Sequence, residues 1–241
     1  MERYVERWYR RHTQAQDLVP FSVKVKESDL LIFAEKDLKE KAEHRLLRER
    51  KNLEAYIRYD PRFAESLVPI SLPPFAPPIC RLMARVSREA EVGPMAAVAG
   101  AINEAVAEEL IPESPELIIE NGGDLLVVSQ KERVVAIYAG EDSPFSFRVG
   151  IRLRGGTFGV ATSSGKVGPS LSFGRADAVV AVAKSSALAD AWATSLANRV
   201  KRREDVEPVL QFARRITSLE GVVVIFEDVL GVEGKIELEK L

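Results

Sequence analysis

One feature constrains the fold of this 241-residue chain more than any other: it has two alanine-rich helical segments, and a series of short β-rich runs lies between them. Residues 95–110 and 187–200 carry apolar side chains at helical spacing. The strands that we expect between and after them are 117–120, 125–129, 133–139, 147–153, 159–161, 177–183, 222–226 and 235–238, with a last helix at 205–216. This order predicts an α+β protein in which helices pack against antiparallel sheets.

The first 80 residues differ from the rest of the chain in composition and in hydrophobic pattern. Residues 23–33 alternate apolar and polar side chains around a polar centre, which predicts a hairpin exposed on one face. Residues 37–59 are rich in charge but keep one apolar stripe, which predicts a long amphipathic helix. The proline-rich residues 69–78 predict an extended connector. We therefore expect a single compact domain in which an N-terminal hairpin, helix and connector, 1–80, pack on a core, 81–241.

Charge and residue usage exclude several classes of function. The net charge is −2, from 34 basic and 36 acidic residues, so no global field attracts nucleic acid or an anionic membrane. No run of roughly 18 uninterrupted apolar residues is present, and we expect a soluble, cytoplasmic protein. Cys80, His12 and His44 are too few and too scattered for a Cys/His metal site. Any metal must therefore be held by oxygen.

The first of three polar islands is a glycine pair flanked by an amide and a carboxylate. Its residues are Asn121, Gly122, Gly123 and Asp124. Paired glycines allow positive φ and a close backbone approach to a ligand, while the carboxylate could bind a hydroxyl, an amide or a metal. The alternative is a plain hairpin turn, for which Asn-Gly is a strong signal.

The second island is a loop rich in hydroxyl groups that follows a predicted strand. Its residues are Thr162, Ser163, Ser164 and Gly165. Hydroxyls and backbone N–H groups of this kind suit phosphate or ribose recognition, and Lys166 or Arg175 could neutralise a phosphate. A flexible connector is the alternative for this glycine- and serine-rich stretch.

The third island lies on the second alanine-rich helix. Asp190 and Thr194 are four residues apart and project from one face, so a carboxylate and a hydroxyl could share a cation. Oxygen ligands suit Mg²⁺, which keeps several waters and takes other ligands from substrate phosphates. The alternative is that Asp190 only decorates the helix surface.

Together the islands resemble the ApbE family of FAD:protein FMN transferases. The match runs from the helix start at Gly93-Pro94-Met95-Ala96-Ala97 through the three islands. A closer likeness, over nearly the whole chain, is to an uncharacterised branch of that superfamily that carries the run from Ala161 to Gly174. The resemblance implies a T-fold-like arrangement of antiparallel sheets and helices.

The resemblance also implies ligands for particular residues. Asp190, Thr194 and the backbone carbonyl of Ala96 would hold Mg²⁺, and the two loop islands would bind FAD. The transferases carry a Lys-Gly pair where this chain has Ala97-Val98, and they carry a histidine in the segment that corresponds to 168–174. The expected function is therefore binding of a flavin nucleotide or a similar phosphorylated ligand with Mg²⁺, and no catalytic residue is assigned.

Two other classes of function stay open at this point. One is an Mg²⁺-dependent FMN transferase, acting on an acceptor protein, or an FAD pyrophosphatase. The other is a structural or assembly protein without enzymatic activity, in which the connector and the charged helix recruit a partner. A homodimer is compatible with either class. Nucleic-acid and membrane partners are not expected.

Overall fold

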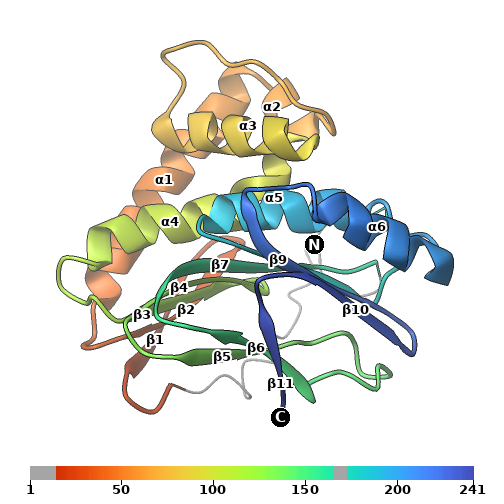
Figure 1. The fold of residues 1–241 in the computed structure, drawn as a ribbon. Helices are drawn as coiled ribbons and strands as arrows, with labels where there is room; N and C mark the ends of the chain where they lie inside the picture. Colours follow the sequence, from red (N-terminus) through yellow and green to blue (C-terminus); the bar gives the residue numbers. More distant parts are fainter. Residues whose placement is uncertain (1–14, 166–172) are drawn as a thin grey trace.

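The computed structural model describes residues 15–165 and 173–241 and arranges them in three layers. Figure 1 shows the helices above a large sheet and a small sheet beneath it. The helices are α1 (Lys39–Tyr59), α2 (Arg62–Glu65), α3 (Pro78–Ala90), α4 (Val98–Leu110), α5 (Ser186–Ala197) and α6 (Val206–Ala213). Two 3₁₀ helices, η2 (Pro94–Ala97) and η3 (Arg203–Asp205), lead into α4 and α6.

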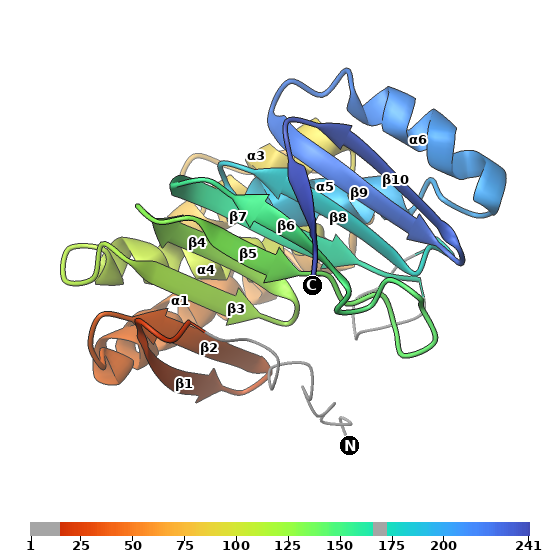
Figure 2. The ribbon, with the colours of Figure 1, turned by 60° about the horizontal axis from the view of Figure 1, so that its bottom comes forward.

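Both sheets are antiparallel throughout. Eight strands form the large sheet in the order β1-β2-β3-β4-β7-β8-β9-β10, and three form the small sheet in the order β11-β6-β5. The strands are β1 (Val19–Val25), β2 (Ser28–Ala34), β3 (Leu117–Asn121), β4 (Asp124–Ser129), β5 (Arg133–Ala136), β6 (Val149–Leu153), β7 (Gly156–Ser163), β8 (Ala178–Ala183), β9 (Leu219–Phe226), β10 (Val229–Gly234) and β11 (Glu237–Lys240). Figure 2 shows β1 and β10 at opposite edges of the large sheet.

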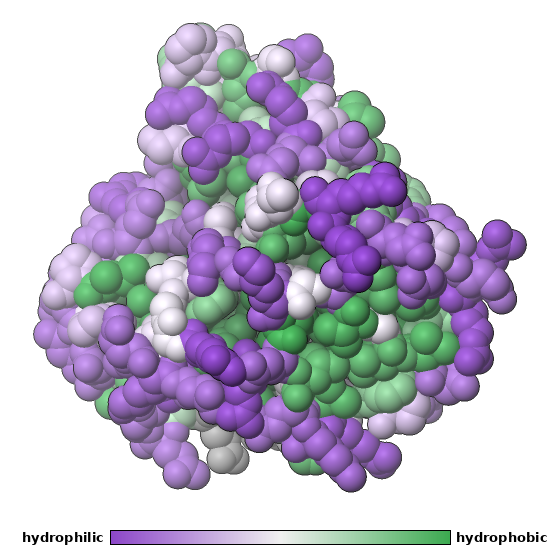
Figure 3. Space-filling view, viewed as in Figure 1, coloured by the Kyte–Doolittle hydropathy of each residue, from purple (hydrophilic) through white to green (hydrophobic). Residues whose placement is uncertain are grey.

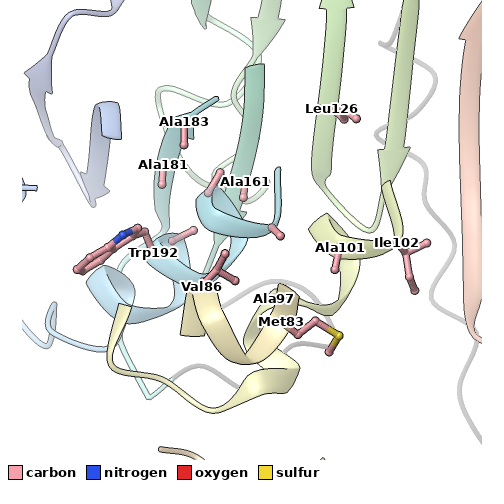
Figure 4. Close-up of a cluster of buried hydrophobic side chains, with 14 of the residues drawn as sticks. Met83, Val86, Ala97, Ala101, Ile102, Leu126, Ala161, Ala181, Ala183 and Trp192 are labelled. Atoms are coloured by element: carbon pink, nitrogen blue, oxygen red, sulfur yellow. The ribbon is translucent and has the colours of Figure 1, made fainter. Parts of the chain in front are cut away.

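Small side chains let the helices lie close to the large sheet. Ala161 on β7 and Ala181 on β8 are fully buried beneath α5, beside Trp192 (Figure 4). Gly159 brings the backbones closer still, because a Cβ at this position would lie 2.3 Å from the Ser186 Cα. The alanine-rich composition of α5 and β8 thus permits a tightly packed helix layer.

A second core fills the space between the two sheets. Phe33, Ile118 and Val127 from the large sheet meet Ile151 and Leu153 from β6, and all five are buried. The large sheet therefore has an apolar layer on each face. The sequence pattern predicted that the hairpin would be exposed on one face, and for β2 this was wrong. Because both faces of the large sheet are covered, β2 is buried along nearly its whole length.

Most of the predicted elements are confirmed. The hairpin forms as β1 and β2, the charged segment forms α1, and the two alanine-rich segments form η2 with α4 and α5. The sequence analysis missed α3 and β10. Pro78 begins α3 at a position where a missing N–H is tolerated, so the proline-rich connector runs directly into a helix.

The division between residues 1–80 and 81–241 stays a prediction, and residues 80 and 81 both lie in α3. That helix packs against α1 on one side and α5 on the other, which joins the two parts of the chain. Within the ranges 15–165 and 173–241, no helix is both long and apolar enough to cross a membrane.

Candidate functional site

The first turn of α4 is the point at which the first and third polar islands meet. Asn121 at the end of β3 donates from Nδ2 to the Ala99 carbonyl, with a distance of 3.4 Å. Asp190 on α5 accepts from the Gly100 backbone N–H at 3.0 Å through Oδ2. One helix turn is therefore held by a strand from one side and by a helix from the other.

Gly100 makes this approach possible because it has no side chain. A Cβ at Gly100 would lie 2.2 Å from the Ser186 carbonyl oxygen at the start of α5. No real Cβ approaches a backbone oxygen so closely, so any larger residue would push α5 away. The position of Asp190 relative to α4 thus depends on a glycine.

The first island is a tight two-residue turn between β3 and β4. Gly122 and Gly123 occupy its centre with φ of 72° and 103°, and Asn121 pairs with Asp124 across it. The hairpin that Asn-Gly predicted is confirmed. Glu120 fixes the turn further, because its Oε1 accepts the Gly123 N–H at 2.8 Å.

Asp124 connects the first island to the second. Its carboxylate Oδ1 accepts the Thr162 backbone N–H at 3.2 Å, which joins the start of β4 to β7. The Asp124 side chain is buried and Thr162 is half-buried. Two polar segments that lie 38 residues apart in sequence are therefore in direct contact.

The rest of the second island continues from β7 into a loop. Ser163 is the buried last residue of β7, and Gly165 donates its N–H to the Ala176 carbonyl at 3.0 Å. Lys166 and most of the segment 168–174, which carried sequence predictions, lie outside the described residues. Arg175 is exposed, and its backbone N–H bonds to the Val200 carbonyl at 2.8 Å.

Asp190 has an unusual protonation equilibrium. Asp190 as a whole is half-buried. The protein packed around its carboxyl removes water from that group and raises its pKa from 3.8 to about 7. Hydrogen bonds from the Gly100 and Ala99 backbone N–H groups oppose this shift without cancelling it. A carboxylate in this setting gains much from a nearby cation, because a cation restores the stabilisation that burial removes.

Thr194 lies on the same helix as Asp190, and Ala96 lies on the neighbouring η2. Thr194 is one turn further along α5, and Ala96 belongs to η2, which packs against α5. Both residues are half-buried. No group of three or more His, Cys, Asp or Glu side chains within the described ranges is arranged to hold a metal. A cation at Asp190 would thus rely on neutral oxygen donors and on its ligand.

The sequence analysis did not identify Asn103 and Glu104 on α4. Glu104 Oε1 accepts from the Ser185 hydroxyl at 2.6 Å and from the Ala187 N–H at 3.0 Å, so it caps the start of α5. Asn103 donates from Nδ2 to the Asp124 carbonyl at 3.0 Å and is fully buried. A signal was present, because these are polar residues on the inner side of an otherwise apolar helix.

The Asn103 amide oxygen is buried and has no hydrogen-bond partner among the described residues. An acceptor in that state costs about 1–3 kcal/mol of stability. This acceptor lies beside Asp124, at the point where α4 holds the β3–β4 turn.

Comparison with known proteins places this arrangement in a family. A family model described as "AbpE bacteria" matches residues 10–225. The chain is 41% identical over 220 residues to a UPF0280 protein of Methanocaldococcus jannaschii, covering 88% of this chain and 89% of the relative. It is 43% identical over 197 residues to a UPF0280 protein of Methanothermobacter thermautotrophicus, covering 79% and 76% of the two chains.

Solved structures share the fold at much lower identity. The ApbE protein of Thermotoga maritima matches with a TM-score of 0.55 and 10% identity, covering 90% of this chain and 97% of that structure. The flavin transferase ApbE of Vibrio cholerae matches with a TM-score of 0.52 and 14% identity over the same shares. The chain therefore belongs to the ApbE-like family and, within it, to the UPF0280 branch.

Proposed function

We propose that this protein binds a flavin nucleotide, or a similar phosphorylated ligand, together with Mg²⁺ at the first turn of α4. The observation that carries the proposal is the convergence on Ala99 and Gly100 of Asn121 and Asp190, with Asp124 next to them. The fold that this chain shares with flavin transferases supports a flavin as the ligand.

The residues at Asp190 fit a magnesium ion. One carboxylate, one hydroxyl from Thr194 and the Ala96 carbonyl would give an all-oxygen set that leaves room for waters and phosphate oxygens. The raised pKa of Asp190 supports the same assignment, since no lysine or arginine of the described ranges contributes to that pKa. A bound cation would supply the positive charge that the carboxylate otherwise lacks.

The loop islands would hold the organic part of the ligand. The turn at Gly122 and Gly123 leaves its outer side open, because a Cβ on Gly123 would meet no atom within 4 Å. Thr162, held by Asp124, would present its hydroxyl beside that turn.

Mg²⁺, when bound, would neutralise phosphate charge and polarise a phosphoryl oxygen. The residues Ala97 and Val98 supply no cation there, so we propose binding without assigning a catalytic group.

A titration of the purified protein with FAD, followed by flavin fluorescence with and without Mg²⁺, tests this proposal. Wild-type protein is expected to bind FAD in an Mg²⁺-dependent manner. Asp190→Asn should lose that affinity by about tenfold or more, because the amide keeps the shape but not the charge. Thr194→Val should weaken Mg²⁺ dependence less.

Asp142→Asn, which changes an exposed aspartate in the loop between β5 and β6, is the matched control and should bind as wild type does. The proposal would be overturned by wild-type protein that shows no FAD affinity in either condition. Equal Mg²⁺-dependent binding by Asp190→Asn and wild type would overturn the metal assignment.

A further inference from the structure

The large sheet ends in two edge strands that differ in how they resist pairing. β1 carries Pro20 and Lys24, two residue types that discourage another strand from adding to an edge. β10 reads Val-Leu-Gly-Val-Glu-Gly and holds neither proline nor lysine. Within the described part of the chain, β9 is the strand paired with β10, and its outer side has no strand beside it.

The surface around β10 is apolar. Figure 3 shows a continuous hydrophobic area on the face where β9 and β10 lie in Figure 1. Val232 is 37% exposed, and Val229 and Leu230 are half-buried. A shallow groove runs between α6 and β10, with the buried apolar residues Val206 and Leu210 and also charged Arg203, Glu204 and Glu207 among its lining residues. Apolar surface of this kind marks an interaction site more often than a chance exposure.

The register of the β9–β10 hairpin defines which backbone groups of β10 face outward. Phe226 pairs with Val229 across a two-residue turn. In such a hairpin the backbone N–H and C=O groups of Val229, Gly231 and Glu233 bond to β9. Leu230 and Val232 therefore direct their N–H and C=O groups away from β9. An antiparallel strand centred on Gly231 could use both of them.

We propose that β10 pairs with β10 of a second copy of this chain, antiparallel, about a two-fold axis at Gly231. In this register Leu230 lies opposite Val232 of the second copy, so these two apolar residues meet. Glu227, in the turn before β10, lies at the same end of the pair as Lys235 of the second copy, because both are four residues from the axis. These two residues are exposed and carry opposite charges, one at each end of β10.

The two-fold axis repeats each contact, so the pairing brings two Glu227–Lys235 pairs together. Self-complementary charge at both ends favours a second copy over an unrelated strand. The result is a continuous sixteen-stranded sheet made from two eight-stranded halves. This dimer does not depend on the ligand site at α4, and it forms without FAD or Mg²⁺.

A charge swap tests the proposed register. The molar mass of the full chain is measured by sedimentation equilibrium over a range of concentrations at low salt. Glu227→Lys or Lys235→Glu alone brings like charges together at both ends of the pair, which should weaken the dimer by about tenfold or more. The double variant Glu227→Lys with Lys235→Glu should restore the wild-type dissociation constant.

The swap is not expected to change folding. Glu227 has φ of 54°, and lysine meets the same backbone strain there as glutamate does. A second variant, Val232→Lys, introduces a charge into the edge and should give a monomer. Val134→Lys, at a 41% exposed valine on the edge strand β5 of the small sheet, is the control and should stay dimeric.

Three results would overturn the proposal. Wild-type protein could be a monomer at about 100 μM, which would mean that the strands do not pair with useful affinity. Both single swaps could leave the dimer unchanged, which would place the interface on another face. The double swap could fail to restore the dimer that the single swaps weaken, which would exclude this register.

Discussion

The Asp190 carboxylate accepts the Gly100 backbone N–H at 3.0 Å, and this bond joins the two alanine-rich helices at the candidate site. The bond can form because Gly100 has no side chain, which lets the start of α5 lie directly beside Gly100. The same close contact thus determines both how the helices pack and where the proposed metal ligand lies. Changes to the packing should therefore appear in ligand binding as well.

Gly100→Ala should destabilise the protein although alanine favours helices. The new Cβ would meet the Ser186 carbonyl at 2.2 Å, and overpacking of this kind costs about 1–3 kcal/mol. Elsewhere in a helix the same change would stabilise by about 0.5–1 kcal/mol. Urea denaturation measures the free energy of unfolding, and FAD titration of the folded variant should show weaker binding. A variant at least as stable as wild type would contradict the described packing.

Asn103→Leu should loosen the β3–β4 turn with little effect on overall stability. The variant loses the bond to the Asp124 carbonyl but also removes the buried amide oxygen that has no partner in the described structure. These effects oppose each other, so we expect a change of less than about 1 kcal/mol in the free energy of unfolding. Amide hydrogen exchange at residues 122–124 should become faster.

Asn52→Leu, at a half-buried residue of α1, is the control for Asn103→Leu and should leave exchange in that turn unchanged. The assigned role of Asn103 fails if its variant loses more than about 3 kcal/mol while exchange at the turn stays as in wild type.

Glu116 should make stability depend on pH below neutrality. Burial alone would raise the pKa of this carboxyl, but hydrogen bonds from Ser129, the Gln130 N–H and Arg133 outweigh burial and lower it below 4.5. The ionised group thus stabilises the fold above about pH 4.5, and this contribution is lost as pH falls further. Glu116→Gln should therefore be less stable than wild type at pH 7, and the difference should shrink in acid.

Urea midpoints of wild type and Glu116→Gln at pH 7 and at about pH 3.5 give this comparison. Glu65→Gln, at an exposed glutamate, is the control and should follow wild type at both pH values. A stability difference that grows in acid would contradict the sign expected for a lowered pKa.

Local sequence patterns predicted most of the fold. The alternation of residues 23–33 and the apolar stripe of 37–59 depend on near neighbours, and β1, β2 and α1 form where expected. β10 escaped prediction because Gly231 and Gly234 interrupt its short apolar pattern. The helix α3 escaped because it begins inside a proline-rich segment that favours extended structure.

The candidate site was predictable in its parts but not in its assembly. Asp190 and Thr194 share a helix face by spacing alone, and the glycine pair predicted a turn. The bonds of Asn121 to Ala99 and of Asp124 to Thr162 link distant segments, and no local pattern encodes such contacts. The supporting role of Asn103 also depends on which residues its helix face meets.

The most direct test of the metal assignment is a crystal structure of the protein grown with FAD and Mn²⁺, which replaces Mg²⁺ at oxygen sites and gives an anomalous signal. We predict one anomalous peak within about 2.0–2.6 Å of a carboxylate oxygen of Asp190, with Thr194 and the Ala96 carbonyl as further ligands and a phosphate of the nucleotide on the metal. An ordered nucleotide with Mn²⁺ bound away from Asp190, or with no metal at all, would contradict the account.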